Sequence, residues 1–112
     1  MLFLVTGKYT EPGALLPPEQ VVPFVKERVI PSLAMWAKWE EQGKIKAGGV
    51  LAGQREGVFI LEANSGEELG EVLTSLPFWH DLTWDIKPLQ SMRSAAERER
   101  RLVQQIEAAA KP

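Results

Sequence analysis

Hydrophobic residues along the chain form four short runs with the length and pattern of β-strands. Two runs, Leu2–Val5 and Val58–Leu61, are apolar at every position, which is typical of strands buried on both faces. The other two runs are less uniform. Leu82–Lys87 alternates between apolar and polar residues, and Ile45–Ala52 contains adjacent glycines that indicate a bulge or a close backbone approach. The pattern therefore predicts two central strands and two edge strands.

Two segments between these runs have the residue spacing of amphipathic helices. The first covers residues 17–42, and its apolar positions recur every three or four residues, at Val22, Val25, Val29, Leu33 and Trp36. Pro31 lies inside it without a backbone N–H, so we expect a kink or a division into two pieces. The second covers residues 65–76, with Asn64 or Ser65 as its N-terminal cap.

A third helix is long and polar, and it follows the last strand. It begins near Ser91, and Glu99 interrupts its thin apolar stripe of Met92, Ala96, Val103, Ile106 and Ala110. The order strand, helix, strand, strand, helix, strand is that of the ferredoxin-like α+β fold, βαββαβ with a four-stranded antiparallel sheet. A chain of 112 residues has the size of one domain, with residues 1–89 as the core and 90–112 as the C-terminal helix.

Two helices cover only one face of such a sheet, and the central strands are apolar on both faces. Depending on which face the helices cover, the uncovered side chains are Phe3, Val5, Phe59 and Leu61, or Leu2, Leu4, Val58 and Ile60. A monomer rarely exposes an apolar patch of several hundred Å². We expect the sheet of a second subunit to cover it, in a face-to-face homodimer or higher homo-oligomer. The alternative is the chain's own C-terminal helix, but its thin stripe suits it better to the rim or the partner.

Composition excludes several classes of function. The net charge is −2, so the chain lacks the basic excess that nucleic-acid binding requires. The absence of cysteine excludes disulfides, thiolate nucleophiles and cysteine-bound metals, and one histidine leaves no metal cluster. No apolar run approaches the length of a membrane span or a signal peptide, so we expect a cytoplasmic protein.

Several motifs give the chain a family resemblance over about nine-tenths of its length. They include Met1-Leu2-Phe3, the hairpin at Ala52-Gly53, and Leu76-Pro77-Phe78 followed by an alternating strand with Leu82, Trp84 and Ile86. With these motifs the chain resembles muconolactone isomerase and its relatives in the dimeric α+β barrel superfamily. The resemblance implies a bacterial protein with a mostly apolar pocket inside the barrel. It also implies an isomerase that moves a proton in a small lactone without metal or organic cofactor. The first helix with its prolines and the Arg/Glu-rich C-terminal helix depart from the family pattern.

Three residues near the fourth strand are candidates for proton transfer. His80 is the only histidine, and imidazole titrates near neutral pH, so it could shuttle a proton, although a solvated loop position is the simpler explanation. Asp85 and Lys87 share the polar face of the strand. If that face points into the barrel, Asp85 could be the base and Lys87 could stabilise an enolate-like charge. If it points outward, the two residues protect an edge strand.

Aromatic residues are the candidates for substrate binding. Tyr9 ends the first strand and could donate a hydrogen bond into the pocket mouth or simply cap the strand. Trp79 and Trp84 could wall an aromatic pocket for a small apolar or aromatic-derived molecule, although the periodicity also fits Trp84 as a core residue. The same fold would also accommodate a cofactor-free monooxygenase or a non-catalytic ligand-binding or assembly protein.

Overall fold

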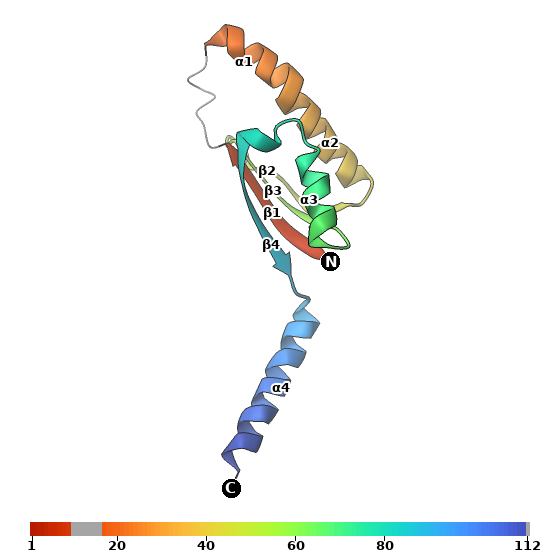
Figure 1. The fold of residues 1–112 in the computed structure, drawn as a ribbon, viewed down its shortest axis with the longest axis vertical. Helices are drawn as coiled ribbons and strands as arrows, with labels where there is room; N and C mark the ends of the chain where they lie inside the picture. Colours follow the sequence, from red (N-terminus) through yellow and green to blue (C-terminus); the bar gives the residue numbers. More distant parts are fainter. Residues whose placement is uncertain (10–16, 112) are drawn as a thin grey trace.

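The four predicted strands form one antiparallel sheet. The computed structural model describes residues 1–9 and 17–111. The sheet has the order β2-β3-β1-β4, and its strands are β1 (Leu2–Tyr9), β2 (Ile45–Val50), β3 (Glu56–Glu62) and β4 (Leu82–Leu89) (Figure 1). The two runs that are apolar at every position are the central strands, as predicted. The element order confirms the ferredoxin-like α+β fold.

The helices cover the face of the sheet that carries the larger apolar side chains. Phe3, Val5, Phe59 and Leu61 are buried beneath them. The opposite face, here called the open face, carries the other set. Its centre is Leu4, which lies opposite Ile60 on β3 and Lys87 on β4. In the single chain this open face is uncovered.

A β-bulge interrupts the edge strand β2. The pairing with β3 shifts register between Ile45 and Ala47, and Gly48 follows with a φ of +121°. A Cβ at Gly48 would also collide with the backbone of Val58 and Phe59. Both the positive φ and the lack of space therefore require glycine at this position. The adjacent glycines therefore mark both a bulge and a close backbone approach.

The first helical segment is divided into three pieces. These are α1 (Pro18–Phe24), a π-helical turn η2 (Val25–Val29) and α2 (Ile30–Glu41). Pro31 lies in the first turn of α2, where its missing N–H is tolerated, and the π turn precedes it. Because the π turn shifts the helical register, the predicted stripe does not continue straight. Trp36 of the predicted stripe is buried, whereas Leu33 is exposed, and α2 buries Ser32 and Trp39 in addition.

The second helix and the following turn close the core. In α3 (Gly66–Thr74), the Ser65 hydroxyl caps the helix by accepting a hydrogen bond from the N–H of Glu68 at 3.1 Å. The segment after Pro77 forms a short 3₁₀ helix, η3 (Trp79–Asp81), where the sequence predicts a loop. The buried Ser32 hydroxyl accepts from the N–H of Phe78 at 3.1 Å and so joins α2 to this turn.

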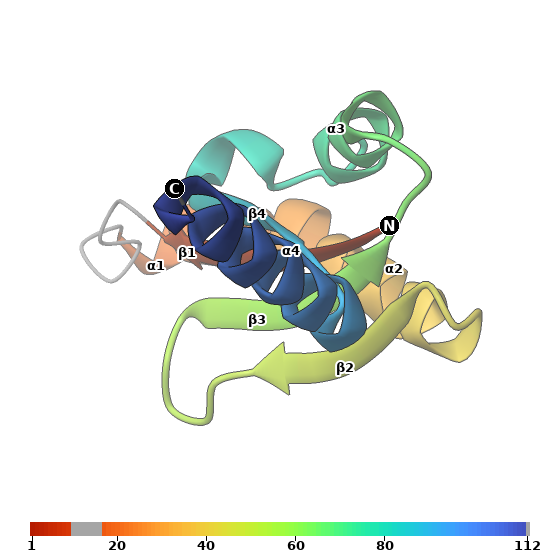
Figure 2. The same cartoon turned by 90° about the horizontal axis from the view of Figure 1, so that it is seen from below.

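The C-terminal helix α4 (Met92–Ala110) projects away from the rest of the molecule (Figure 1), and in the view from below it lies in front of the sheet (Figure 2). None of its residues is buried. The radius of gyration is 19.6 Å, whereas a compact domain of this length would have about 13 Å. In the single chain α4 therefore packs neither on the open face nor at the rim of the sheet. No helix within residues 17–111 is long and apolar enough to cross a membrane.

Candidate functional site

A cavity lies between the helix-covered face of the sheet and the α1–α2 segment. Its volume is about 160 Å³, and its lining is almost wholly apolar. Gly7 and Gly57 form its floor, while Trp36, Phe78 and Leu82 contribute to its walls. Arg55 and Glu56, from the end of the β2–β3 hairpin, are the charged residues that line it. The cavity can thus hold a small apolar molecule within reach of very few polar groups.

Tyr9 separates this cavity from a second one. The second cavity has a volume of about 190 Å³ and lies against Val21, Phe24 and Val25. The Tyr9 ring packs edge-on against Phe24 and Phe78, with centroid distances of 6.0 and 6.3 Å. Tyr9 and Arg55 line both cavities, so the two hollows form one region around the phenol ring.

Two polar atoms of this region are buried without a hydrogen-bond partner in the described residues, namely the Trp36 indole Nε1 and the Tyr9 hydroxyl. The hydroxyl is the one that can both donate and accept. Burial, and to a smaller extent the negative charge of Asp81, raise the pKa of Tyr9 to about 12, and the positive charge of Arg55 opposes this shift. Tyr9 is therefore a neutral phenol at physiological pH, and it can donate a hydrogen bond.

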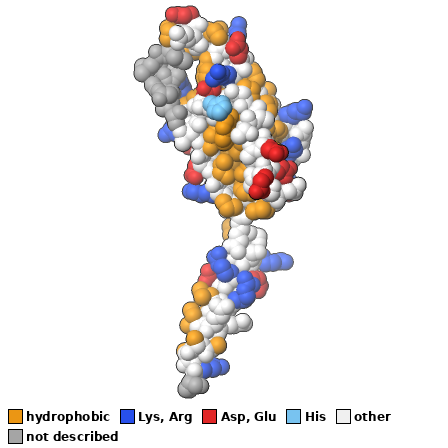
Figure 3. All heavy atoms as spheres, in the orientation of Figure 1, with side chains coloured by type: hydrophobic (Ala, Val, Ile, Leu, Met, Phe, Trp, Pro, Cys, Tyr) orange, Lys and Arg blue, Asp and Glu red, His pale blue; other side chains and the backbone are white. Residues whose placement is uncertain are grey.

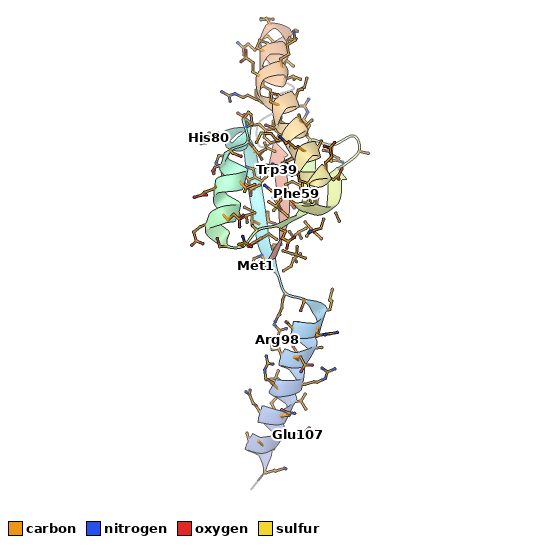
Figure 4. The ribbon with its side chains drawn as sticks, turned by 90° about the vertical axis from the view of Figure 1, so that its right-hand side faces the viewer. Met1, Trp39, Phe59, His80, Arg98 and Glu107 are labelled. Atoms are coloured by element: carbon orange, nitrogen blue, oxygen red, sulfur yellow. The ribbon has the colours of Figure 1, made fainter. Side chains whose placement is uncertain are left out.

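An ion pair joins the helical segment to the turn before β4. Arg28 of η2 donates from Nη1 to both carboxylate oxygens of Asp81, at 3.0 and 3.2 Å. Because Asp81 also acts on the pKa of Tyr9, this pair belongs to the surroundings of the phenol. His80, beside Asp81, is exposed at the outer surface next to this charged pair (Figures 3 and 4).

Trp79 and Trp84 lie close together behind the cavity. Their rings stack at a centroid distance of 5.0 Å, and the Trp84 indole N–H donates to the Trp79 carbonyl at 3.0 Å. Neither residue is among those that line the cavity. Trp84 instead packs edge-on against Trp36 at 6.4 Å, and Trp36 forms part of the cavity wall. The two tryptophans thus support the wall from behind.

Asp85 and Lys87 lie on the other side of the sheet. Asp85 is opposite Thr6 and Lys87 is opposite Leu4, so both side chains belong to the open face. They form an ion pair at 3.5 Å, and each side chain is more than 60% exposed in the single chain. The structure therefore brings the two predicted charged residues together but separates them from Tyr9, Trp79 and Trp84 by the thickness of the sheet.

Sequence reasoning missed the pairing of Arg28 with Asp81 and the part played by Arg55. Arg28 and Asp81 are 53 positions apart in the chain, and nothing in the local sequence pattern links them. Arg55 lies in a hairpin turn, where a solvated charge is the ordinary interpretation. Within residues 1–9 and 17–111, no three His, Asp or Glu side chains are placed to share a metal ion.

Comparison with known proteins decides the family. A scan against protein families matches residues 1–95 to the family described as muconolactone delta-isomerase. The chain belongs to the muconolactone delta-isomerase family. A search of the curated proteins finds no match.

Solved structures agree with this family at the level of the fold. The crystal structure of muconolactone isomerase superposes with a TM-score of 0.64 at 18% identity, covering 81% of this chain and 90% of that one. The dehydrochlorinase for 5-chloro-2-hydroxyhydroquinone from Burkholderia phenoliruptrix AC1100, in complex with 2,5-dihydroxybenzoquinone, superposes with a TM-score of 0.58 at 21% identity. That match covers 84% of this chain and 98% of the dehydrochlorinase.

Proposed function

We propose that this protein is a cofactor-free isomerase or lyase that binds a small carbonyl compound beside Tyr9 and transfers a proton within it. The observation that carries the proposal is the Tyr9 hydroxyl, which is buried at an apolar cavity and has no hydrogen-bond partner among residues 1–9 and 17–111. A buried polar group without a partner costs about 1–3 kcal/mol. A substrate carbonyl oxygen that accepts from Tyr9 would remove this cost, so the site is suited to a ligand with an acceptor atom.

Tyr9 stabilises the charge that proton transfer creates. Removing a proton next to a carbonyl places negative charge on the carbonyl oxygen. With a pKa of about 12, Tyr9 keeps its own proton at neutral pH, and its hydrogen bond to that oxygen strengthens as the charge develops. The dehydrochlorinase was solved with a dihydroxybenzoquinone, which carries carbonyl groups of this kind. The apolar lining makes the hydrogen bond stronger than it would be in water.

His80 is the residue that exchanges the proton in this proposal. His80 is exposed and does not itself line the cavity. It lies on η3 between Phe78 and Leu82, which both line the cavity, so this role requires its ring to turn inward beside the Arg28–Asp81 pair. A neutral imidazole is suited to take a proton from carbon and return it at another position. Asp85 and Lys87 are the second candidates. They would act as base and charge stabiliser only in a site between two sheets.

That second arrangement requires a homodimer, which is part of the proposal. The open face exposes a set of apolar side chains at its centre, namely Leu2, Leu4, Val58 and Ile60. A second copy of the same face would cover them and enclose Asp85 and Lys87. We also place the protein in the cytoplasm of a bacterium, and the lack of cysteine is the feature that fits this location.

The test is turnover of muconolactone in D2O, followed by NMR for the change of isomer and for deuterium incorporated at carbon. We expect Tyr9→Phe to lower kcat by about 10²–10³-fold through loss of one charge-stabilising donor. We expect His80→Asn to lower it by about 10²–10⁴-fold through loss of the proton carrier. Thr83→Val, on the open face of β4, is the matched control and should keep full activity.

The variants also separate the two candidate sites. Full activity in Asp85→Asn together with loss in His80→Asn places the chemistry on the helix side. The reverse result places it between two sheets and overturns the assignment to Tyr9 and His80. Binding of 2,5-dihydroxybenzoquinone without turnover or deuterium exchange of either compound would indicate a ligand-binding protein and overturn the proposed catalysis.

A further inference from the structure

The helix α4 is exposed along its whole length, and most of it lies beyond the part of the chain that matches the family. That match ends at residue 95, whereas α4 continues to Ala110. Figure 3 shows hydrophobic side chains along the projecting helix, among lysine and arginine. Met92 is 89% exposed and Ile106 is 59% exposed. Most helical stability in proteins comes from packing of an apolar face, so the exposed apolar residues of α4 indicate a packing partner.

Apart from Ala108, the exposed apolar residues of α4 lie on one side of the helix. At 3.6 residues per turn, these positions occupy an arc of about 140°. Leu102, Val103 and Ile106 form the centre of this stripe, and small alanines extend it at both ends, namely Ala95, Ala96, Ala109 and Ala110. Spacings of three and four residues are those of a helix that packs against another helix.

Among residues 1–9 and 17–111, the rest of the chain does not supply the partner. Figure 1 shows α4 continuing beyond the end of β4, away from the sheet and from the other helices. In Figure 4, Arg98 and Glu107 both lie along this projection, remote from the body. We propose that two copies of the chain associate through antiparallel contact between their α4 helices.

The charges on α4 select the antiparallel arrangement. If the twofold axis passes between Leu102 and Val103, residues whose numbers sum to 205 lie opposite each other. Leu102 then lies at the height of the partner's Val103. Arg100 and Glu107 lie on the same side of the stripe, so Arg100 of each helix faces the partner's Glu107. Symmetry forms each of these contacts twice. The alanines at the two ends face one another, so the helices can approach closely.

A parallel arrangement would bring like charges together. It would place Glu99, the one charged residue within the stripe, beside the partner's Glu99. In the antiparallel arrangement Glu99 instead faces the partner's Ile106. There it keeps its ion pair with Arg98 of its own helix, at 3.4 Å. Like charges close together oppose association, so the parallel pair is disfavoured.

Cysteine cross-linking tests both the contact and its direction, because the natural chain contains no cysteine. The full chain carrying Val103→Cys is compared with the full chain carrying Ala96→Cys, and both are oxidised at the same micromolar concentration. Position 103 is next to the axis, so the two thiols of a Val103→Cys pair lie within reach of each other. In the antiparallel pair the two thiols introduced by Ala96→Cys are separated by roughly 20 Å at 1.5 Å per residue, too far for a disulfide.

We expect the Val103→Cys chain to form the disulfide dimer at least about tenfold faster than the Ala96→Cys chain, because paired thiols react at an effective concentration in the millimolar range. Equal, fast cross-linking of both chains would indicate parallel helices and overturn the proposal. Slow cross-linking of both would show that α4 does not pair, and it would also overturn the proposal.

Measurement of the mass in solution provides a second test without cysteine. Replacing Leu102 and Ile106 with glutamate places two charges in the stripe, so the assembly should fall to half the mass of the wild type. The control replaces Gln104 and Ala108 with glutamate, which adds the same charge on the opposite side of α4. The control should keep the wild-type mass. An unchanged mass in the stripe variant, or an equal loss in both variants, contradicts the proposal.

Discussion

The six-membered ring of Trp36 lies directly against Gly57. A Cβ at Gly57 would come within 2.7 Å of Cζ3 and Cη2 of the indole, so the ring occupies the space where a side chain would be. Gly7, which pairs with Gly57 across β1 and β3, is covered in the same way by Trp84, with a Cβ distance of 2.9 Å. Two glycines in the central strands thus let two large rings pack onto the sheet. The glycines form the floor of the cavity, and Trp36 forms part of its wall.

We expect Gly57→Ala to destabilise the protein by about 1–3 kcal/mol, because the added methyl group displaces Trp36 in a packed core. The matched control is Gly70→Ala within α3, where a Cβ meets nothing within 4 Å. That change should stabilise the fold by about 0.5–1 kcal/mol, since alanine is the better helix residue. Urea denaturation of both variants measures the difference. Equal effects would mean that the ring does not rest on Gly57.

Tyr9 is the only tyrosine in the chain, so absorbance titration of the phenol reports this residue alone. We expect its pKa to be about 12 in the folded protein. Asp81→Asn should lower that pKa towards the ordinary value of about 10, because the carboxylate disfavours the phenolate. Asp85→Asn, on the opposite face of the sheet, should leave it unchanged. A wild-type pKa near 10 would contradict the burial of the hydroxyl.

The same pKa shift has a consequence for stability in alkali. Because the folded state holds the Tyr9 proton more tightly than the unfolded state, its contribution is fully present below pH 10. It is lost as the pH rises from about 10 to about 12. Tyr9→Phe removes this contribution, so the variant should lose less stability than the wild type over this range. The free energy of unfolding of the wild type and of Tyr9→Phe, measured as a function of pH, would reveal the difference. Identical profiles for the two proteins would contradict a raised pKa of Tyr9.

The sequence predicted the fold because strand burial leaves a local pattern. Leu2–Val5 and Val58–Leu61 are apolar at every position, and that alone distinguished the central strands from the edges. The cap at Ser65 and the division of the first helix near Pro31 were also readable from single residues and their neighbours. Each of these features depends on residues that are close together in the chain.

The features that the sequence did not predict depend on contacts between distant segments. The pattern could not say which face of the sheet the helices cover, since both faces of β1 and β3 are apolar. It therefore could not place Asp85 and Lys87 on the face opposite Tyr9. The π turn shifted the buried stripe of α2 away from Leu33. Whether His80, Asp85 or Lys87 acts in catalysis stays a prediction.

The open face provides a test of the homodimer that is independent of α4. Ile60 lies opposite Leu4 at the centre of this face. In a chain whose α4 stripe already carries Leu102→Glu and Ile106→Glu, we expect Ile60→Glu to convert a dimer of about 25 kDa, twice the chain mass of 12.5 kDa, into a monomer. Gln20→Glu on α1, the same change of charge far from the open face, should leave the dimer intact. A dimer that survives Ile60→Glu would mean that the open face is not the interface.

The two helix caps should differ in their effect, because α3 packs on the core and α4 does not. The Ser65 hydroxyl accepts from the N–H of Glu68, and the Ser91 hydroxyl accepts from the N–H of Ser94 at 3.0 Å. Ser65→Ala should lower the free energy of unfolding by about 1 kcal/mol, since α3 buries Leu69 and Leu73. Ser91→Ala should reduce the helical circular dichroism of α4 and leave the unfolding of the core unchanged. If Ser91→Ala destabilised the core as much as Ser65→Ala does, α4 would be part of the core's cooperative unit.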